Sequence, residues 1–246
     1  MKKPLEEFHL FHGNRAIVLS SGGIDSTTCV AYTVDYFGKQ NVCTVSFLYG
    51  QKHSKELDCA KAIADYYGVN HYVLNISEIL KYSDCPLMQN STKDVELGSY
   101  SDQVTRNKDG MVSTYVPFRN GLFLSIAAAY ADALFPGEEV EIYYGAHADD
   151  AAGQAYADCS PEFAEAMNTA ISIGTYGKIT VCRPLINMNK SQVVAEGLRL
   201  KVPYELTWSC YEGGEEACGT CGTCIDRLNA FRANGVKDPI KYKEAE

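Results

Sequence analysis

Four cysteines near the C-terminal end of the chain have the spacing of a metal site. They follow the pattern C-x7-C-x2-C-x2-C in a sequence of 246 residues that contains ten cysteines. Four thiolates fill the tetrahedral shell of a Zn²⁺ ion and leave no position for water, so the pattern predicts a structural zinc site. An iron–sulfur cluster also takes four cysteines and is the alternative at this point. The four expected ligands are Cys210, Cys218, Cys221 and Cys224.

A segment rich in glycine and hydroxyl side chains follows the first apolar run, and its residue types suit phosphate. Glycines permit a tight turn with exposed N–H groups, and the N-terminus of a following helix adds donors and partial positive charge. An aspartate within the segment can help to hold Mg²⁺ against the phosphates. A plain turn with a Ser or Asp helix cap is the simpler alternative. The segment reads Ser20-Ser21-Gly22-Gly23-Ile24-Asp25-Ser26-Thr27-Thr28.

This segment resembles the pyrophosphate loop of the N-type ATP pyrophosphatases, whose motif is SGGxDS/T after a first strand. It is neither a GxxxxGK[ST] loop nor a GxGxxG fingerprint. Members of that superfamily adenylate an acyl or carbonyl oxygen, release pyrophosphate and let a nucleophile displace AMP. The resemblance therefore implies that ATP binds with Mg²⁺. The ATP-binding residues it implies are Leu19, Ser20, Ser21, Gly22, Gly23, Ile24, Asp25, Ser26, Thr27 and Thr28.

Four further segments resemble one family within that superfamily, the 7-cyano-7-deazaguanine (preQ0) synthases, or QueC family. The resemblance runs from about residue 16 to about residue 233. It implies an adenine nucleotide alpha hydrolase-like (HUP) fold and a homodimer. The segments are Tyr49–His53, Tyr115–Asn120, Tyr156–Cys159 followed by Glu162-Phe163, and Leu206–Tyr211 with the cysteines that follow it.

Several charged or polar residues in these segments are candidates for the site. Arg119 carries a planar fork of donors suited to a phosphate or carboxylate, although a surface ion pair is the alternative. Asn120 and Asp158 are expected to bind the base or carboxylate of the substrate, and Asn120 could equally cap a helix. Lys190 could neutralise phosphate charge. We therefore expect Asp25, Arg119 and Lys190 to be catalytic.

Two histidines and one acidic pair are given no specific role. Asp149-Asp150 could bind a second metal or an amino group of the base, or could be an exposed acidic pair. His53 and His147 could lie near the site, but a lone histidine is more often a hydrogen-bonded structural residue. Neither histidine is expected to transfer a proton.

The elements that must position these residues alternate between strands and helices. Such alternation predicts an α/β protein with a doubly wound, parallel, five-stranded sheet. In such a sheet ligands bind beyond the carboxyl ends of the strands, so the loops there should converge. The expected strands are 16–20, 42–49, 71–76, 140–144 and 179–181. The expected helices are 26–37, 55–67, 120–134, 161–173, 191–200 and 224–233.

Two regions stand outside this alternation. Residues 81–115 lose periodicity and are expected to be a functional lid or mobile segment. A boundary near Val202-Pro203 separates a pyrophosphatase domain, 1–202, from a zinc-binding C-terminal segment, 203–246. That segment is too short for its own apolar core, which also favours a metal.

Composition restricts the class of partner. The chain has 22 basic and 31 acidic residues, a formal net charge of −9, which disfavours binding to nucleic acid or to anionic membranes. No apolar run is long enough to cross a bilayer and no leader signature is present, so the expected location is cytoplasmic. Ten cysteines in a reducing compartment favour metal binding over disulfides. The six outside the cluster are expected to pack as small apolar residues.

The resemblance implies an activity. It predicts an ATP-dependent carbon–nitrogen ligase that converts 7-carboxy-7-deazaguanine and ammonia to 7-cyano-7-deazaguanine, through an acyl-adenylate and an amide. Two departures raise an alternative: Phe118 and Ala157 stand where the family commonly has glycine and proline. A divergent relative could stop at the amide or transfer the deazaguanine acyl group to a protein amine.

Three other classes fit the sequence less well. A tRNA-thiolating enzyme would need a basic surface that the net charge disfavours. A zinc nucleobase deaminase would show H-x-E and P-C-x-x-C, which this chain lacks. A zinc-binding adaptor without activity would require the glycine loop to be vestigial.

Overall fold

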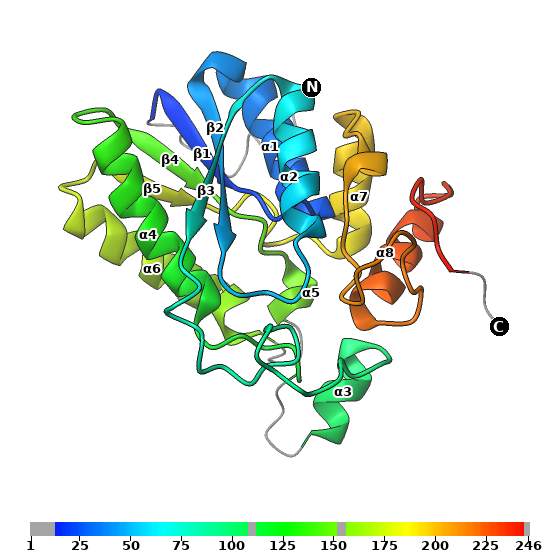
Figure 1. The fold of residues 1–246 in the computed structure, drawn as a ribbon. Helices are drawn as coiled ribbons and strands as arrows, with labels where there is room; N and C mark the ends of the chain where they lie inside the picture. Colours follow the sequence, from blue (N-terminus) through cyan, green and yellow to red (C-terminus); the bar gives the residue numbers. More distant parts are fainter. Residues whose placement is uncertain (1–12, 108–111, 152–155, 244–246) are drawn as a thin grey trace.

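Five short apolar segments form one parallel β-sheet in the computed structural model, which describes residues 13–107, 112–151 and 156–243 (Figure 1). The side chains of four of these strands are largely buried, as expected for strands covered on both faces, whereas those of the edge strand at residues 70–75 are exposed or half-buried. The order in the sheet is β3-β2-β1-β4-β5. The strands are β1 (Arg15–Leu19), β2 (Val42–Leu48), β3 (Asn70–Asn75), β4 (Val140–Tyr143) and β5 (Ile179–Cys182).

The strand order changes direction between β1 and β4. The chain winds outward from β1 through β2 to β3, and then returns to place β4 on the other side of β1. The loops after β1 and β4 therefore leave the sheet in opposite directions and open a crevice at its carboxyl edge. The segment after β1 contains Ser20–Thr28, which we call the phosphate-type loop, and the segment after β4 contains Gly145–His147.

Helices cover both faces of the sheet (Figure 1). The apolar core on one face is formed with α1, α2, α7 and α8, and the core on the other face with α4 and α6. The long helices are α1 (Ile24–Phe37), α2 (Lys55–Tyr67), α4 (Arg119–Leu134), α6 (Pro161–Gly174), α7 (Lys190–Arg199) and α8 (Gly222–Ala233). The short ones are α3 (Tyr100–Arg106) and α5 (Ala148–Ala151).

The structure confirms the predicted fold class, with all five strands and six helices present within a few residues of their expected bounds. The interpretation of residues 81–115 as a segment without regular structure is wrong at α3. Ser99 caps this helix by accepting a hydrogen bond from the Asp102 backbone N–H, at 3.3 Å. With only 7 residues, α3 is too short to show a helical period. No helix in the described ranges is long and apolar enough to cross a membrane.

The C-terminal residues are joined to α8 through a buried ion pair. Arg227 is fully buried, and its Nε and Nη2 donate to the two carboxylate oxygens of Asp238 at 2.7 and 2.9 Å. Its Nη1 also donates to the Thr207 hydroxyl, at 2.7 Å. These bonds join the residues before and after the cysteine cluster. The boundary near Val202-Pro203 stays a prediction.

Candidate active site and metal site

The loop between β1 and α1 presents a concave set of donors at the crevice. Gly22 has a φ of 78°, a conformation that L side chains rarely adopt, and it turns the chain into α1. The Ser21 backbone N–H and hydroxyl both lie within hydrogen-bond distance of the Ser26 hydroxyl, at 3.2 and 3.1 Å. Ser20 is 4 % exposed, and its hydroxyl has no hydrogen-bond partner within the described parts of the chain. Such an orphaned buried hydroxyl is available to bond water or a ligand oxygen.

Only part of the predicted ATP-binding set faces the cavity. Leu19, Ser20, Ser21, Gly23, Asp25 and Ser26 line it. Ile24 is fully buried in the core instead. Thr27 and Thr28 turn their hydroxyls back to carbonyls of the preceding turn, at 2.7 and 2.9 Å. In α1, residues three and four positions apart lie on the same face, so Ile24, Thr27 and Thr28 point away from the crevice, which a linear motif does not reveal.

A carboxylate, a lysine and a histidine from three segments meet at the start of α1. Lys190, the first residue of α7, lies 2.6 and 2.8 Å from the two carboxylate oxygens of Asp25. Its Nζ also lies 3.3 Å from Nε2 of His147, which follows β4 and is almost fully buried. Burial alone would raise the pKa of Asp25, but Lys190 and His147 outweigh it and lower that pKa. Asp25 therefore stays charged across the physiological range.

Arg119 begins α4 and lies at the opposite wall. It donates to the Tyr49 hydroxyl at 3.3 Å, and its guanidinium carbon lies 5.7 Å from the Tyr49 ring centre. Burial opposes its charge, but Tyr49, Tyr211, Tyr156 and Asp158 raise its pKa. Arg119 is thus a permanent cation in a partly buried position that faces the cavity.

Asn120 and Asp158 are bonded to each other. The Asp158 carboxylate accepts from the Asn120 backbone N–H at 3.0 Å, and the Asn120 amide donates to the Asp158 carbonyl and to the Cys159 Sγ, both at 3.2 Å. Asp158 is buried and is not among the residues that line the cavity, whereas Asn120 and Cys159 are. An unpaired N–H in the first turn of α4 needs an acceptor, and Asp158 supplies it.

These groups surround one cavity of about 290 Å³ at the carboxyl edge of the sheet. It brings together the three residues expected to be catalytic and the ends of β1, β2 and β4. It also contains Glu56, His147 and Trp208, to which no role was assigned from the sequence. Asp149 lies outside it and accepts a hydrogen bond from the Lys190 backbone N–H, at 2.7 Å, at the start of α7.

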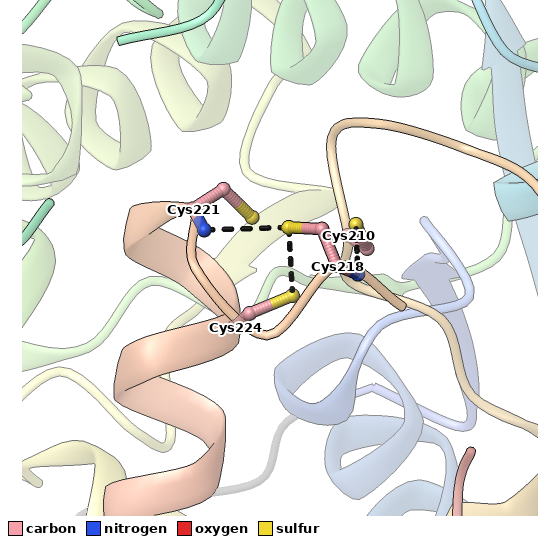
Figure 2. Close-up of side chains that lie close together, drawn as sticks. All are labelled: Cys210, Cys218, Cys221 and Cys224. Carbon is pink, nitrogen blue, oxygen red and sulfur yellow. Dashed lines mark hydrogen bonds between the residues drawn. The ribbon is translucent and has the colours of Figure 1, made fainter. Parts of the chain in front are cut away.

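The four predicted metal ligands converge between a loop and the start of α8 (Figure 2). Their Sγ atoms all lie within 4.8 Å of one another. Around a tetrahedral Zn²⁺ with Zn–S bonds of about 2.3 Å, sulfur atoms would be about 3.8 Å apart, so the cluster fits a single ion. The Cys210 Sγ accepts from the Cys218 N–H at 3.3 Å, and the Cys218 Sγ accepts from the Cys221 N–H at 3.3 Å.

The cysteine segment lies directly against the phosphate-type loop. The Trp208 backbone N–H donates to the Gly22 carbonyl at 2.9 Å, and the Trp208 indole N–H donates to the Cys210 carbonyl at 2.9 Å. The Lys55 Nζ lies 3.5 Å from the centre of a Trp208 ring and donates to the carbonyls of Gly214 and Glu215. The predicted metal site therefore contacts and supports the turn at Gly22.

The two departures from the family pattern stand outside the cavity. Phe118 is 55 % exposed, and its ring packs over Gly121 and lies 5.9 Å from the Phe163 ring. It has a φ of 52°, a left-handed conformation that favours glycine. Ala157 is exposed as well. Neither residue is among those that line the cavity.

Comparison with known proteins assigns this chain to a family. The family model described as "Queuosine biosynthesis protein QueC" matches residues 15–235. The chain belongs to the QueC family. A QueC-family relative from Caldicellulosiruptor saccharolyticus, named 7-cyano-7-deazaguanine synthase, is 44% identical over 229 residues, which cover 93% of this chain and 96% of the relative. One of the same name from Archaeoglobus fulgidus is 42% identical over 231 residues, covering 94% and 91%.

More distant solved structures share the fold of this QueC-family chain. An NMN synthetase from Francisella tularensis has a TM-score of 0.50 and 13% identity, and the match covers 95% of this chain and 82% of that one. The U34-tRNA thiolase NcsA from Methanococcus maripaludis, solved with its [4Fe-4S] cluster, has a TM-score of 0.50 and 14% identity, covering 91% and 68%.

Proposed function

We propose that this chain is an ATP-dependent carbon–nitrogen ligase that makes 7-cyano-7-deazaguanine from 7-carboxy-7-deazaguanine and ammonia. Two observations support it. The chain belongs to a family whose curated members carry that name at 40–44% identity over more than nine-tenths of this chain. The phosphate-type loop and Arg119, a permanent cation, also lie in one cavity. This shared cavity is the structural observation that carries the proposal.

The nucleotide would lie along the loop between β1 and α1. The orphaned Ser20 hydroxyl, the N–H groups before α1 and the Ser21 and Ser26 hydroxyls would hold phosphate oxygens. Lys190 would neutralise phosphate charge, and Asp25 would hold Mg²⁺ once Lys190 has turned to the phosphates. Bound Mg²⁺ supplies charge stabilisation on the transferring phosphate. The binding of ATP would thus replace the ion pair between Lys190 and Asp25 by one between Lys190 and the phosphates.

The acid would lie on the Arg119 side of the cavity. The guanidinium can orient the carboxylate so that one oxygen attacks the α-phosphate of ATP and pyrophosphate leaves. Ammonia then displaces AMP to give the amide. A second activation, on the amide oxygen, and loss of AMP give the nitrile. The protein supplies orientation and charge stabilisation in each step.

For the cysteine cluster we propose one structural Zn²⁺. The sulfur atoms lie within 4.8 Å of one another, which suits a single ion better than a cluster of several bridged irons. A closed Cys₄ shell leaves no position for a substrate, and its place beside Trp208 gives it a supporting role. We also propose a homodimer, to be measured by sedimentation of the purified chain.

Mass spectrometry of the products tests the proposed activity. The purified chain is incubated with the acid, ATP, Mg²⁺ and ammonium, and the masses of the amide and the nitrile are followed over time. Appearance of the amide and then the nitrile supports the proposal. Product that stops at the amide, or that forms only when a protein amine is supplied, contradicts nitrile formation and supports the divergent activity.

Replacement of Arg119 by lysine is expected to raise the KM of the acid about tenfold or more in acid-dependent ATP–pyrophosphate exchange. Hydrogen bonds to charged groups contribute about 1.5–3 kcal/mol, and lysine lacks the fork that holds both carboxylate oxygens. The KM of ATP should change little. A variant with an unchanged KM for the acid and a raised KM for ATP would place Arg119 on the nucleotide instead.

Replacement of Phe118 by glycine is expected to leave the steady-state kcat/KM of the acid within a factor of about two. Its ring is exposed and outside the cavity, and substitutions at such positions change free energies by about 0.5 kcal/mol or less. The glycine also suits the left-handed backbone there. A tenfold change would show that the ring contributes to the substrate site.

A further inference from the structure

Glu56 lines the active-site cavity and has no part in the steps described so far. It lies in the first turn of α2, directly after the Tyr49–His53 segment at the end of β2. Its side chain is partly buried, and no hydrogen bond joins its carboxylate to another residue within the described parts of the chain. A carboxylate placed in this way is available to a bound substrate.

The backbone around Glu56 is packed tightly against the phosphate-type loop. A side chain at Gly22 would clash with the Glu56 carbonyl, and it would approach the Ala60 nitrogen and the Cys59 Cβ to 2.8 and 2.9 Å. Lys55, the preceding residue, is fixed on the Trp208 ring. Glu56 is therefore held in a constant position relative to the loop on which the nucleotide phosphates would lie.

The surroundings of Glu56 suit proton transfer near neutral pH. Burial raises the pKa of Glu56 to about 7, although Arg119 acts to lower it. A carboxylate with a pKa near the working pH is an efficient general base. The titratable and charged groups around it come from several elements. Those with an electrostatic interaction with Glu56 are Arg119 of α4, Tyr49 after β2 and Cys59 of its own helix. Further charged or titratable groups that line the same cavity are Lys52, His53, Asp25, His147, Lys190, Tyr211 and Asp226.

We propose that Glu56 is the group that accepts protons from the substrate nitrogen, an inference that rests on the proposed function. When ammonia attacks the acyl-adenylate, a C–N bond forms and the nitrogen becomes positively charged. The Glu56 carboxylate takes one proton from that nitrogen. The C–O bond to AMP then breaks, its electron pair leaves with the AMP phosphate, and the amide remains.

The same position serves the step to the nitrile. After the amide oxygen has attacked a second ATP and pyrophosphate has left, the nitrogen of the adenylated amide carries two protons and a positive charge. Glu56 takes the first proton and releases it to solvent. It takes the second as the C–O bond breaks, so that the N–H electron pair completes the C≡N bond and AMP leaves with the C–O pair. One carboxylate can thus serve both halves of the reaction.

Three variants separate this role from a structural one. Glu56→Gln keeps the shape of the side chain and cannot accept a proton at neutral pH, and Glu56→Asp retains a carboxylate. Asp58→Asn is the matched control, because Asp58 is exposed on the same helix. For each variant we would measure acid-dependent ATP–pyrophosphate exchange, which reports adenylation alone. We would also measure amide formation from ammonia and nitrile formation from supplied amide.

Glu56→Gln is expected to retain exchange within a few-fold of wild type and to slow amide and nitrile formation about 100-fold. Glu56→Asp should recover part of that loss, and Asp58→Asn should match wild type. At constant free ammonia, wild-type single-turnover amide formation should decline below about pH 7, because protonated Glu56 cannot accept a proton. This decline should be absent in Glu56→Gln.

Two results would overturn the assignment. If Glu56→Gln lost exchange and product formation by the same factor, Glu56 would bind substrate or support the fold. If it formed amide and nitrile at the wild-type rate, the proton acceptor would be another group. Absence of acid-dependent exchange in the wild-type chain would instead overturn the proposed function, and this inference with it, so the two failures are distinguishable.

Discussion

Replacement of Asp25 by asparagine is expected to reduce acid-dependent pyrophosphate release about 10²–10³-fold, the usual effect of removing one preorganised electrostatic group from an active site. Asparagine keeps the size of the side chain and removes its charge. Lys190, which lies 2.6 and 2.8 Å from the two carboxylate oxygens, would then lack its anionic partner. The Mg²⁺ that we propose at Asp25 would also lose a ligand. Initial rates of pyrophosphate release at saturating ATP measure the effect.

The matched control is Asp35→Asn, because Asp35 is an exposed carboxylate on the same helix. It should keep wild-type activity. The double variant Asp25→Asn, Lys190→Met should lose more activity than Asp25→Asn alone, because Lys190 would contact the phosphates independently of Asp25 once ATP is bound. An Asp25→Asn enzyme that keeps more than about a tenth of its activity would contradict the role that we give this carboxylate.

The sequence was sufficient for the fold because its signals are local. Each strand is a short apolar run, and each long helix shows its own period or terminal residue, such as the glycine at position 68 that ends α2 with a φ of 66°. Alternation of the two then restricts the sheet to a parallel one, whose loops after β1 and β4 meet at the carboxyl edge. The cysteine spacing was equally informative, since all four sulfur atoms come together.

Roles that depend on the direction of a side chain could not be predicted in this way. Asp158 looked like a substrate ligand in its motif, but its carboxylate accepts the first-turn N–H of α4. Thr28 belongs to the loop motif, yet its hydroxyl lies 3.0 Å from the Tyr204 hydroxyl in the core. His147 and Glu56 carry no distinctive spacing. They enter the site because β4 and α2 end or begin there, which is a property of the tertiary structure.

The contact between the cysteine segment and the glycine turn was also invisible in the sequence. Trp208 and Gly22 are far apart in the chain but share a backbone hydrogen bond of 2.9 Å. Lys55 adds a second link through the Trp208 ring. The structural metal site that we propose would therefore help to determine how well the glycine turn is ordered.

Replacement of Cys218 by serine is therefore expected to abolish metal binding and to weaken productive ATP binding. Structural Zn²⁺ contributes about 10–16 kcal/mol of apparent binding free energy in small zinc domains, and a segment without its own core unfolds when the metal leaves. Loss of order from Cys210 to Cys224 would release Trp208 from Gly22 and Lys55 from Gly214. We expect the metal content to decrease from about one ion per chain to nearly none. The KM of ATP should rise at least about tenfold.

Elemental analysis and far-ultraviolet circular dichroism distinguish this outcome from general unfolding. The apolar clusters on the two faces of the sheet are formed largely by elements outside the cysteine segment, so most helical signal should persist without the metal. Cys43→Ser is the control, because Cys43 lies in β2 and outside the cluster, and it should keep its metal. If Cys218→Ser lost the metal but kept the wild-type KM of ATP, the glycine turn would be ordered by α1 and α2 alone. One zinc per chain without iron or sulfide would support the single-ion site, whereas iron with sulfide would contradict it.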